Sequence, residues 1–336
     1  MTGLQVDLLL PLAFRRLGEW AAGFESLPEL PELAALLGRA RAERLPVRGS
    51  EATLLWCLDP RLDPAAELPA ARRLHPEAAC CADLVHLQAD ALDLRLLPTD
   101  ALALAGEEIA ALAAELNAHL APQGLRWLDL GGGRGALAGL DTTGWRTVPP
   151  DAVAGGGVLA HLSRDPAAAA ANRLFTELQM VLHEAPVNRA REARGALPAN
   201  ALWLWGAGDQ PPGPPAVDAL WSDDPLARRL GEAAGLAVAP LPARWADAPL
   251  PAAGRLLVVH GGLRAAAVAD DMPAWGEAMA ALCRDWLLPA SRAVGRELRS
   301  LRLLAGDGRA WRWRPAARWR WWRRPLPLAR LAQEAA

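Results

Sequence analysis

Residues 183–208 read HEAPVNRAREARGALPANALWLWGAG and combine a cluster of polar side chains with an apolar run. The run at 201–205 has strand length and ends in glycines, which predicts a buried strand. Four side chains of this segment can bind anions: Asn188, Arg191, Arg194 and Asn200. Ligands of open α/β sheets bind at strand ends, and arginines there can hold phosphate or carboxylate through paired hydrogen bonds. The stretch therefore predicts an anion site, the alternative being a solvated loop whose asparagines cap turns.

The sequence after this stretch alternates between strand and helix patterns. Strands are predicted at 217–221, 236–239 and 255–259, and helices at 225–234 and 274–288. Before it, 5–12 predicts a first buried strand and 30–44 a helix. Such alternation predicts an α/β fold with a mostly parallel sheet flanked by helices on both faces.

A different pattern occupies the middle of the chain. Short strands are predicted at 84–87, 92–97 and 125–130, with an amphipathic helix at 106–120 between them. This order predicts a small inserted α+β domain. With Pro-rich segments as linkers, we expect a core made of 1–76 and 158–336, and an insert at 77–157.

Composition excludes several classes of protein. The chain has 336 residues and a net charge of −2, so no nucleic acid partner is expected. The apolar runs are too short or too interrupted to predict a membrane span. Four cysteines without a CxxC pair predict reduced, buried thiols and a cytoplasmic location. There is no lysine, so no Schiff base can form.

The segment from Pro186 to Gly208 resembles a motif of the cofactor-independent phosphoglycerate mutases of the alkaline phosphatase superfamily. In that family PVN, Arg, Gly and PAN precede an apolar strand and WGxG. The segment is also similar to a bacterial family of regulatory proteins known as RpfE, which has an Arg/Trp-rich tail too. The resemblance implies an alkaline-phosphatase-like core, with Gly49–Leu54 at the position of the motif that presents the nucleophilic serine. It places Ser50 at the nucleophile and makes Asn188, Arg191, Arg194 and Asn200 the substrate-binding residues.

The same resemblance implies two divalent metals, such as manganese or zinc, which activate the serine. The metal ligands that remain at the family's positions are Asp7 and Asp307, because the other expected Asp and His residues are replaced. The expectation is therefore a catalytically degenerate, mutase-like protein that binds a small phosphorylated or carboxylated metabolite, with metal only if the site is intact. The alternative is a non-catalytic regulatory or interaction protein on the same scaffold.

Two motifs allow a second interpretation. Ser50 precedes an apolar helix and would also serve as its N-cap. The segment Trp127–Gly135, WLDLGGGRG, resembles the first motif of S-adenosylmethionine-dependent methyltransferases, a weaker alternative function. That chemistry needs a helix directly after the glycines, whereas the residues that follow predict a hairpin.

The tail alternates tryptophan and arginine at 311–314 and again at 318–324. One interpretation is a surface for a protein partner, for single-stranded nucleic acid or for a membrane. The other is a strand with Trp facing the core and Arg facing water, followed by a short helix at 326–332.

Overall fold

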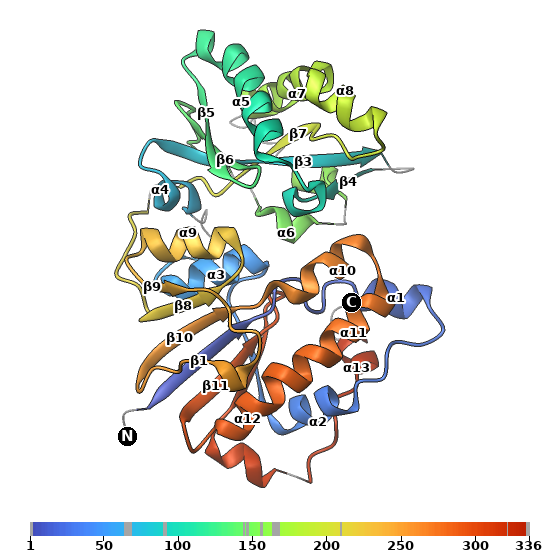
Figure 1. Ribbon diagram of the computed structural model, residues 1–336, viewed down its shortest axis with the longest axis vertical. Helices are drawn as coiled ribbons and strands as arrows, with labels where there is room; N and C mark the ends of the chain where they lie inside the picture. The colour runs from blue at the N-terminus through green and yellow to red at the C-terminus, as the bar shows by residue number, and fades with distance from the viewer. Residues whose placement is uncertain are drawn as a thin grey trace. The chain divides into compact units, whose positions relative to one another are not determined.

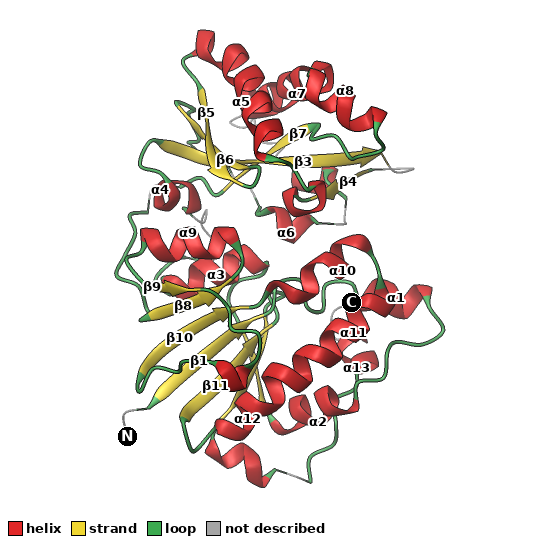
Figure 2. Cartoon of the chain, in the orientation of Figure 1, coloured by secondary structure: helices red, strands yellow, loops and turns green. Residues whose placement is uncertain are grey.

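The computed structural model describes most of the chain as two compact units. The first comprises Met1–Pro60 with Pro214–Ala336, and the second Arg61–Gly213 (Figures 1 and 2). The described residues are 3–63, 69–89, 93–143, 145, 148–154, 157–162, 169–208, 210–320 and 322–333.

A seven-stranded sheet forms the centre of the first unit, in the order β2-β12-β11-β1-β10-β8-β9. Its strands are β1 (Leu4–Leu9), β2 (Arg41–Arg44), β8 (Ala219–Ser222), β9 (Ala237–Ala239), β10 (Gly254–Val259), β11 (Leu298–Leu304) and β12 (Arg309–Trp313). The pairs from β11 through β1, β10 and β8 to β9 are parallel, and β12 and β2 extend the sheet by antiparallel pairing. The predicted α/β class with a mostly parallel sheet flanked by helices is confirmed.

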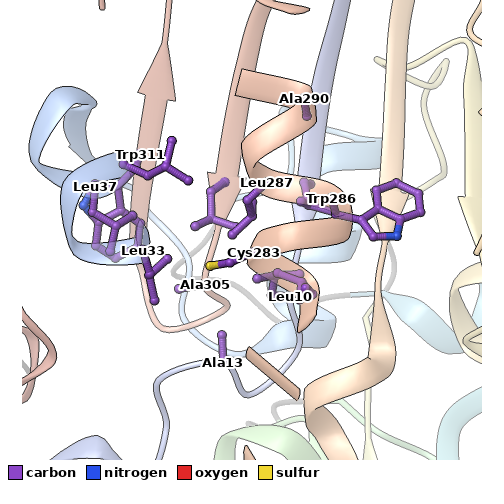
Figure 3. Packing of buried hydrophobic residues seen from close by; sticks show 14 of the residues in the cluster. Leu10, Ala13, Leu33, Leu37, Cys283, Trp286, Leu287, Ala290, Ala305 and Trp311 are labelled. Carbon is purple, nitrogen blue, oxygen red and sulfur yellow. The ribbon is translucent and has the colours of Figure 1, made fainter. Parts of the chain in front are cut away.

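Helices cover both faces of this sheet. They are α1 (Leu17–Gly23), α2 (Pro31–Arg39), α3 (Ser50–Leu58), α9 (Pro225–Ala233), α10 (Arg264–Ala269), α11 (Met272–Leu282), α12 (Leu288–Ala293) and α13 (Leu328–Gln333), with a π-helical turn at Cys283–Leu287 and short 3₁₀ turns at Trp245–Asp247, Gly261–Leu263 and Pro315–Trp319. Leu4, Val6 and Leu8 of β1 pack into a core with α1, α2, α11, α12 and α13 (Figure 1). Figure 3 shows part of this core, including Leu33 and Leu37 of α2 and Ala290 of α12. Because side chains alternate along a strand, Asp7 faces the other side, where α3 lies.

The Arg/Trp tail begins as a strand of this sheet. Trp311 and Trp313 are buried in the core, while Arg312 faces the other side and donates to Glu43 over 2.8 and 2.9 Å. The predicted strand with tryptophan facing the core is confirmed for β12, whereas Arg312 pairs with Glu43 and Arg309 is buried instead of facing water. Further along, the side chains of Trp319 and Trp322 are 63% and 65% exposed, and α13 is close to the predicted closing helix; Trp321 and the side chain of Arg318 lie outside the described residues.

Two elements differ from the sequence prediction. The helix predicted at 30–44 ends at Arg39, because Arg41–Arg44 pairs with β12 as an edge strand. Strand β11 was not predicted, since Arg299 and Arg302 interrupt its apolar pattern.

The second unit is an antiparallel sheet with helices against it. Its strands are β3 (Ala78–Ala89), β4 (Leu94–Leu97), β5 (Arg126–Gly131), β6 (Arg134–Ala138) and β7 (Ala201–Trp205), and its helices α4 (Ala70–Leu74), α5 (Gly106–Leu120), α6 (Pro150–Val153), α7 (Ala169–Glu184) and α8 (Pro186–Ala193), with 3₁₀ turns at Thr99–Leu102, Ala121–Gln123 and Leu159–His161. The long strand β3 pairs with β4, β6 and β7. The start of the strand predicted at 92–97 includes Leu92, which lies outside the described residues.

The second unit extends further along the chain than the predicted insert. We expected the insert to end at 157, yet Arg61–Gly213 forms one unit. The reason is that β7 pairs with β3, and that buried residues of α7, such as Leu178, share a core with Leu112 of α5. The mutase-like motif therefore belongs to the second unit and not to the seven-stranded sheet.

The glycine run of the methyltransferase-like motif forms a hairpin. Strand β5 pairs with β6 across Gly131–Gly133, which all have positive φ. A strand and not a helix follows the glycines, so the hairpin prediction is confirmed and the helix that cofactor binding would need there is missing.

Candidate functional site

Ser50 lies at the carboxyl-end edge of the seven-stranded sheet. After β1 the chain turns at Leu12, whose φ is 57°, and the Leu12 N–H donates to the Ser50 hydroxyl over 3.2 Å. The N-cap of α3 is Gly49, and Ser50 is the first helical residue. The N-cap interpretation of Ser50 is therefore wrong: its oxygen ties the loop after β1 to α3.

The turn that contains Asp307 meets Ser50 at this edge. The Gly49 N–H donates to the Gly306 carbonyl over 2.7 Å. Gly306 has a φ of 74°, and a Cβ atom there would lie 2.8 Å from the Ser50 Oγ. The contact thus requires glycine both for its backbone conformation and for its lack of a side chain. Two of the predicted site residues, Ser50 and Asp307, are brought to one sheet edge.

Asp7 is held by arginine. Its carboxylate, 7% exposed, accepts from Arg302 Nε over 2.9 Å and from Arg302 Nη2 over 2.6 Å. Arg255 adds a further ion pair at 3.4 Å. Burial lowers the pKa of Arg302, but Asp7 outweighs it and the net shift is upward. Asp7 is therefore the anionic half of a buried, two-pronged ion pair.

Asp307 has the same kind of partner. Its Oδ2 accepts from Arg309 Nε over 2.8 Å, and its Oδ1 accepts the Arg309 backbone N–H over 2.9 Å. Arg309 also donates to the Leu331 carbonyl of α13 over 2.7 Å. Among the residues that the structure describes, no three His, Cys, Asp or Glu side chains converge as metal ligands. The donors present do not fit a two-metal centre, and metal ligation by Asp7 and Asp307 stays a prediction.

Arg191 lies inside the second unit, only 1% exposed. It donates to Glu108 Oε2 over 2.6 Å, to the Leu197 carbonyl over 2.8 Å and to the Leu102 carbonyl. These acceptors come from α5, from the turn before it and from the segment after α8. The guanidinium thus joins three segments of the second unit, which favours a structural role.

The other three motif residues also have partners within the second unit. Asn188 donates to the Leu182 and Ala199 carbonyls and accepts the Ala199 N–H. The Asn200 side chain accepts the Leu87 N–H and donates to the Leu87 carbonyl, which adds two hydrogen bonds beside the pairing of β7 with β3. Arg194 binds Glu108 but keeps 56% of its side chain exposed.

Asn188 and Arg191 lie in the helix α8, Arg194 is its C-cap, and Asn200 lies in the segment between α8 and β7. Of the four predicted ligand contacts, Arg194 is the one whose side chain is exposed. Anion binding by the set stays a prediction.

Two polar residues at the carboxyl-end edge were not singled out from the sequence. Ser222 ends β8, donates to the Val259 carbonyl over 3.1 Å and accepts the Asp224 N–H. His260 follows β10, and its Nδ1 accepts the Gly262 N–H over 3.2 Å. Their position in the sequence could have indicated them, since each is the polar residue that directly follows the apolar run of a strand.

His260 is a pH-sensitive group of this edge. Burial lowers its pKa, and the hydrogen bond from Gly262 to Nδ1 assigns the neutral tautomer with hydrogen on Nε2. Its ring also makes an edge contact with Trp286 of the π-helical turn, with ring centroids 5.5 Å apart. Protonation of Nδ1 would break the hydrogen bond from the Gly262 N–H and place a positive charge at a partly buried position.

We expect the unfolding free energy to fall as the pH drops below about 6.5, since the unfolded chain then takes up a proton that the folded chain refuses. In His260→Asn, whose Oδ1 can still accept from Gly262, this pH dependence should weaken by up to about 1.4 kcal/mol per pH unit. Urea unfolding at pH 5, 6 and 7 measures it. The exposed His183→Asn is the control, and equal slopes in His260→Asn and wild type would contradict the assignment.

The cysteines offer no activated nucleophile. All four are buried, and none forms a disulfide bond. Burial raises the pKa of Cys57, Cys80 and Cys283 to about 12. A thiol with such a pKa stays protonated at neutral pH, which suits packing and not catalysis. No helix of the described residues has the length and apolarity to cross a bilayer.

Sequence similarity connects part of the chain to one class of protein, the 2,3-bisphosphoglycerate-independent phosphoglycerate mutases. A probable member from Geobacter sulfurreducens is 38% identical over 68 residues, which are 20% of this chain and 17% of that protein. The enzyme of Methanothrix thermoacetophila is 38% identical over 63 residues, 19% of this chain and 16% of its own length. The similar segments thus span less than a fifth of either relative.

Solved structures of similar proteins cover more of the chain. The cofactor-independent phosphoglycerate mutase of Thermoplasma acidophilum is 15% identical, with a TM-score of 0.38 over 94% of this chain and 90% of that one. The PH0037 protein of Pyrococcus horikoshii is 13% identical, with a TM-score of 0.48 over 93% and 87%. No family model matches the sequence.

Proposed function

We propose that this chain is a phosphoglycerate-mutase-like protein of alkaline-phosphatase-like fold that binds a small phosphorylated or carboxylated metabolite without two-metal phosphoryl transfer. One observation carries the proposal: Asp7 is bound by Arg302 of the neighbouring strand β11, and Asp307, in the turn after β11, is bound by Arg309 at the start of β12. A carboxylate that is neutralised in this way is a poor ligand for a hard divalent cation. The similarity of a 68-residue segment to mutases supports the class of ligand.

The carboxyl-end edge is the proposed position of the metabolite in the first unit. Ser50, the Asp307 turn and His260 all lie there, and ligands of parallel sheets bind at this edge. In the second unit, anion binding by Arg194 stays a separate prediction; 56% of its side chain is exposed. A serine without a paired base or a metal is a weak nucleophile, so Ser50 is proposed to contact the ligand and not to attack it.

Metal analysis, a mutase assay and thermal unfolding with 3-phosphoglycerate test the proposal together. We expect no stoichiometric manganese or zinc, no mutase activity and a higher Tm with the ligand. At about 100 times Kd the stabilisation is about 2.7 kcal/mol. Ser50→Ala should reduce the Tm shift, while Arg229→Gln, at an exposed position of the same unit, should not. Bound metal with mutase activity that Ser50→Ala abolishes would overturn the proposal.

A second candidate is a regulatory or interaction protein that binds no metabolite. The exposed Trp319 and Trp322 next to arginines favour it, because large exposed aromatic side chains are common at protein interfaces. The RpfE-type assignment belongs to this candidate and stays a prediction. Absence of any Tm shift across a panel of phosphorylated and carboxylated metabolites would favour it over the first.

A further inference from the structure

A pocket opens at the other end of the seven-stranded sheet, at the amino-terminal ends of β1 and β11. Its volume is about 880 Å³, which is in the range of small-molecule sites. Its polar lining includes Gln5, Ser300, Arg296, Arg299, Arg312 and Arg314. Since β1 has six residues and rises about 3.3 Å at each, this amino-end pocket lies a strand's length from the Ser50 edge.

The charges of the amino-end pocket are unbalanced. Arg312 is neutralised by Glu43. Arg296, Arg299 and Arg314 are exposed and have no ion pair within the described part of the chain. Glu297 is the carboxylate in the lining. The three unpaired arginines and this carboxylate leave an excess of two positive charges around one cavity.

A β-bulge in β11 sets the position of Arg299. Leu4 pairs with Leu298 and Gln5 with Ser300, so β11 has one extra residue, Arg299, at this point. A bulge changes the direction of a side chain, and bulges are frequent next to functional sites. The neighbouring Gly3 leaves room, since a Cβ atom there would lie 3.4 Å from the Arg299 Cβ. The extra residue thus adds a guanidinium at the end of the sheet without disturbing the pairing beyond it.

The walls of the pocket restrict the ligand to a small molecule. Pro251 and Pro315 line its sides together with Leu250 and Gly295. Proline and short apolar side chains give a rigid wall, which suits a compact ligand better than a flexible polymer. The overall charge of −2 also opposes a long polyanion.

We infer that the amino-end pocket binds a small organic molecule with two anionic groups, held by Arg299 and Arg314 and supported by Arg296. Guanidiniums bind carboxylate and phosphate through paired, charge-assisted hydrogen bonds, and two such groups match the excess charge. Gln5 and Ser300 also line the pocket and offer polar side chains for the rest of the ligand. This site is independent of the proposed function, which concerns the opposite edge of the sheet.

Titration calorimetry at low salt, with succinate and inorganic pyrophosphate as probes, tests the inference. The double variant Arg299→Gln/Arg314→Gln should weaken binding by about tenfold or more. The control Arg44→Gln/Arg48→Gln has the same change in charge at exposed positions outside this pocket, and should bind as wild type does. Circular dichroism and the Tm without ligand establish that both variants fold.

Three results would overturn the inference. They are an equal loss of affinity in the two double variants, no binding of either probe up to about 10 mM, and acetate binding as tightly as succinate. A Tm shift by 3-phosphoglycerate that persists in Arg299→Gln/Arg314→Gln would belong to the proposed function, so the two proposals can fail separately.

Discussion

Arg191→Met should lower the unfolding free energy by about 3–5 kcal/mol, because it removes the buried one of the two guanidiniums that bind Glu108 and leaves two buried carbonyls without a donor. The side chain of Arg191 is fully enclosed, and its donors satisfy Glu108 and the Leu102 and Leu197 carbonyls. Methionine fills a similar volume but donates nothing, so both carbonyls and one carboxylate oxygen lose a donor. Urea unfolding followed by far-ultraviolet circular dichroism measures the loss.

The control is Arg194→Met, which removes the second guanidinium from the same carboxylate. Because more than half of the Arg194 side chain is exposed, its loss should cost no more than about 1 kcal/mol. If Arg191 instead binds a ligand, Arg191→Met would abolish binding and leave the unfolding free energy unchanged. That result would contradict the structural role.

Acid unfolding is a second test of the bond between Arg191 and Glu108. Burial raises the pKa of Glu108, but the Ala105 N–H and the two arginines outweigh it, so the net pKa lies below its usual 4.5. The stabilisation from this carboxylate is therefore complete above about pH 4.5 and is lost as the pH falls through the lowered pKa. In Arg191→Met the pKa of Glu108 should rise, so that the variant begins to lose stability at a higher pH than wild type.

The order of elements could be predicted from the sequence where the apolar pattern was continuous. The runs around β1, β10 and α5 were recognised, because their side chains face one core with regular spacing. Strand β11 was not, since Arg302 stands at a position that faces α3 and breaks the run. The boundary of the second unit was also misplaced: the pairing of β7 with β3 joins residues more than a hundred positions apart, which local patterns do not encode.

The candidate site shows the same limit. The resemblance implied that Ser50 and Asp307 belong to one site, and the structure brings them to one edge of the sheet. The resemblance gave no sign that Asp7 binds Arg302, which lies 295 residues further along the chain. The same holds for Arg191 and Glu108. The motif was interpreted as an anion site, whereas the partners that its residues have in the structure were decided by the packing of distant segments.

Paired arginines are a recurring feature of both units. Asp83 and Arg134 form a further buried pair in the second unit, at 3.1 Å. The chain contains no lysine, and the planar guanidinium suits buried ion pairs because it forms parallel hydrogen bonds in a fixed geometry. Arginine is thus the cation that compensates the buried carboxylates of Asp7 in the first unit and of Asp83 and Glu108 in the second.

Asp7→Asn tests this view in the first unit, and should lower the unfolding free energy by about 3–5 kcal/mol. Asparagine has the shape of aspartate, so packing is retained, but the buried guanidinium of Arg302 loses its counter-charge. Arg302 would keep its contact with the Trp56 ring, 5.6 Å from the centroid, which compensates little of that loss. Asp218→Asn is the control on the same sheet, because Asp218 is exposed and its amide would still accept the Arg255 N–H.

A double variant distinguishes an ion pair from a metal ligand. Asp7→Leu/Arg302→Met removes both charges and should be more stable than either single variant, since an apolar pair of similar volume avoids the cost of desolvating ions. Stability should also be the same with manganese and with a chelator. If the chelator destabilises wild type but not Asp7→Asn, then Asp7 holds a metal, and the ion pair with Arg302 is not its role in solution.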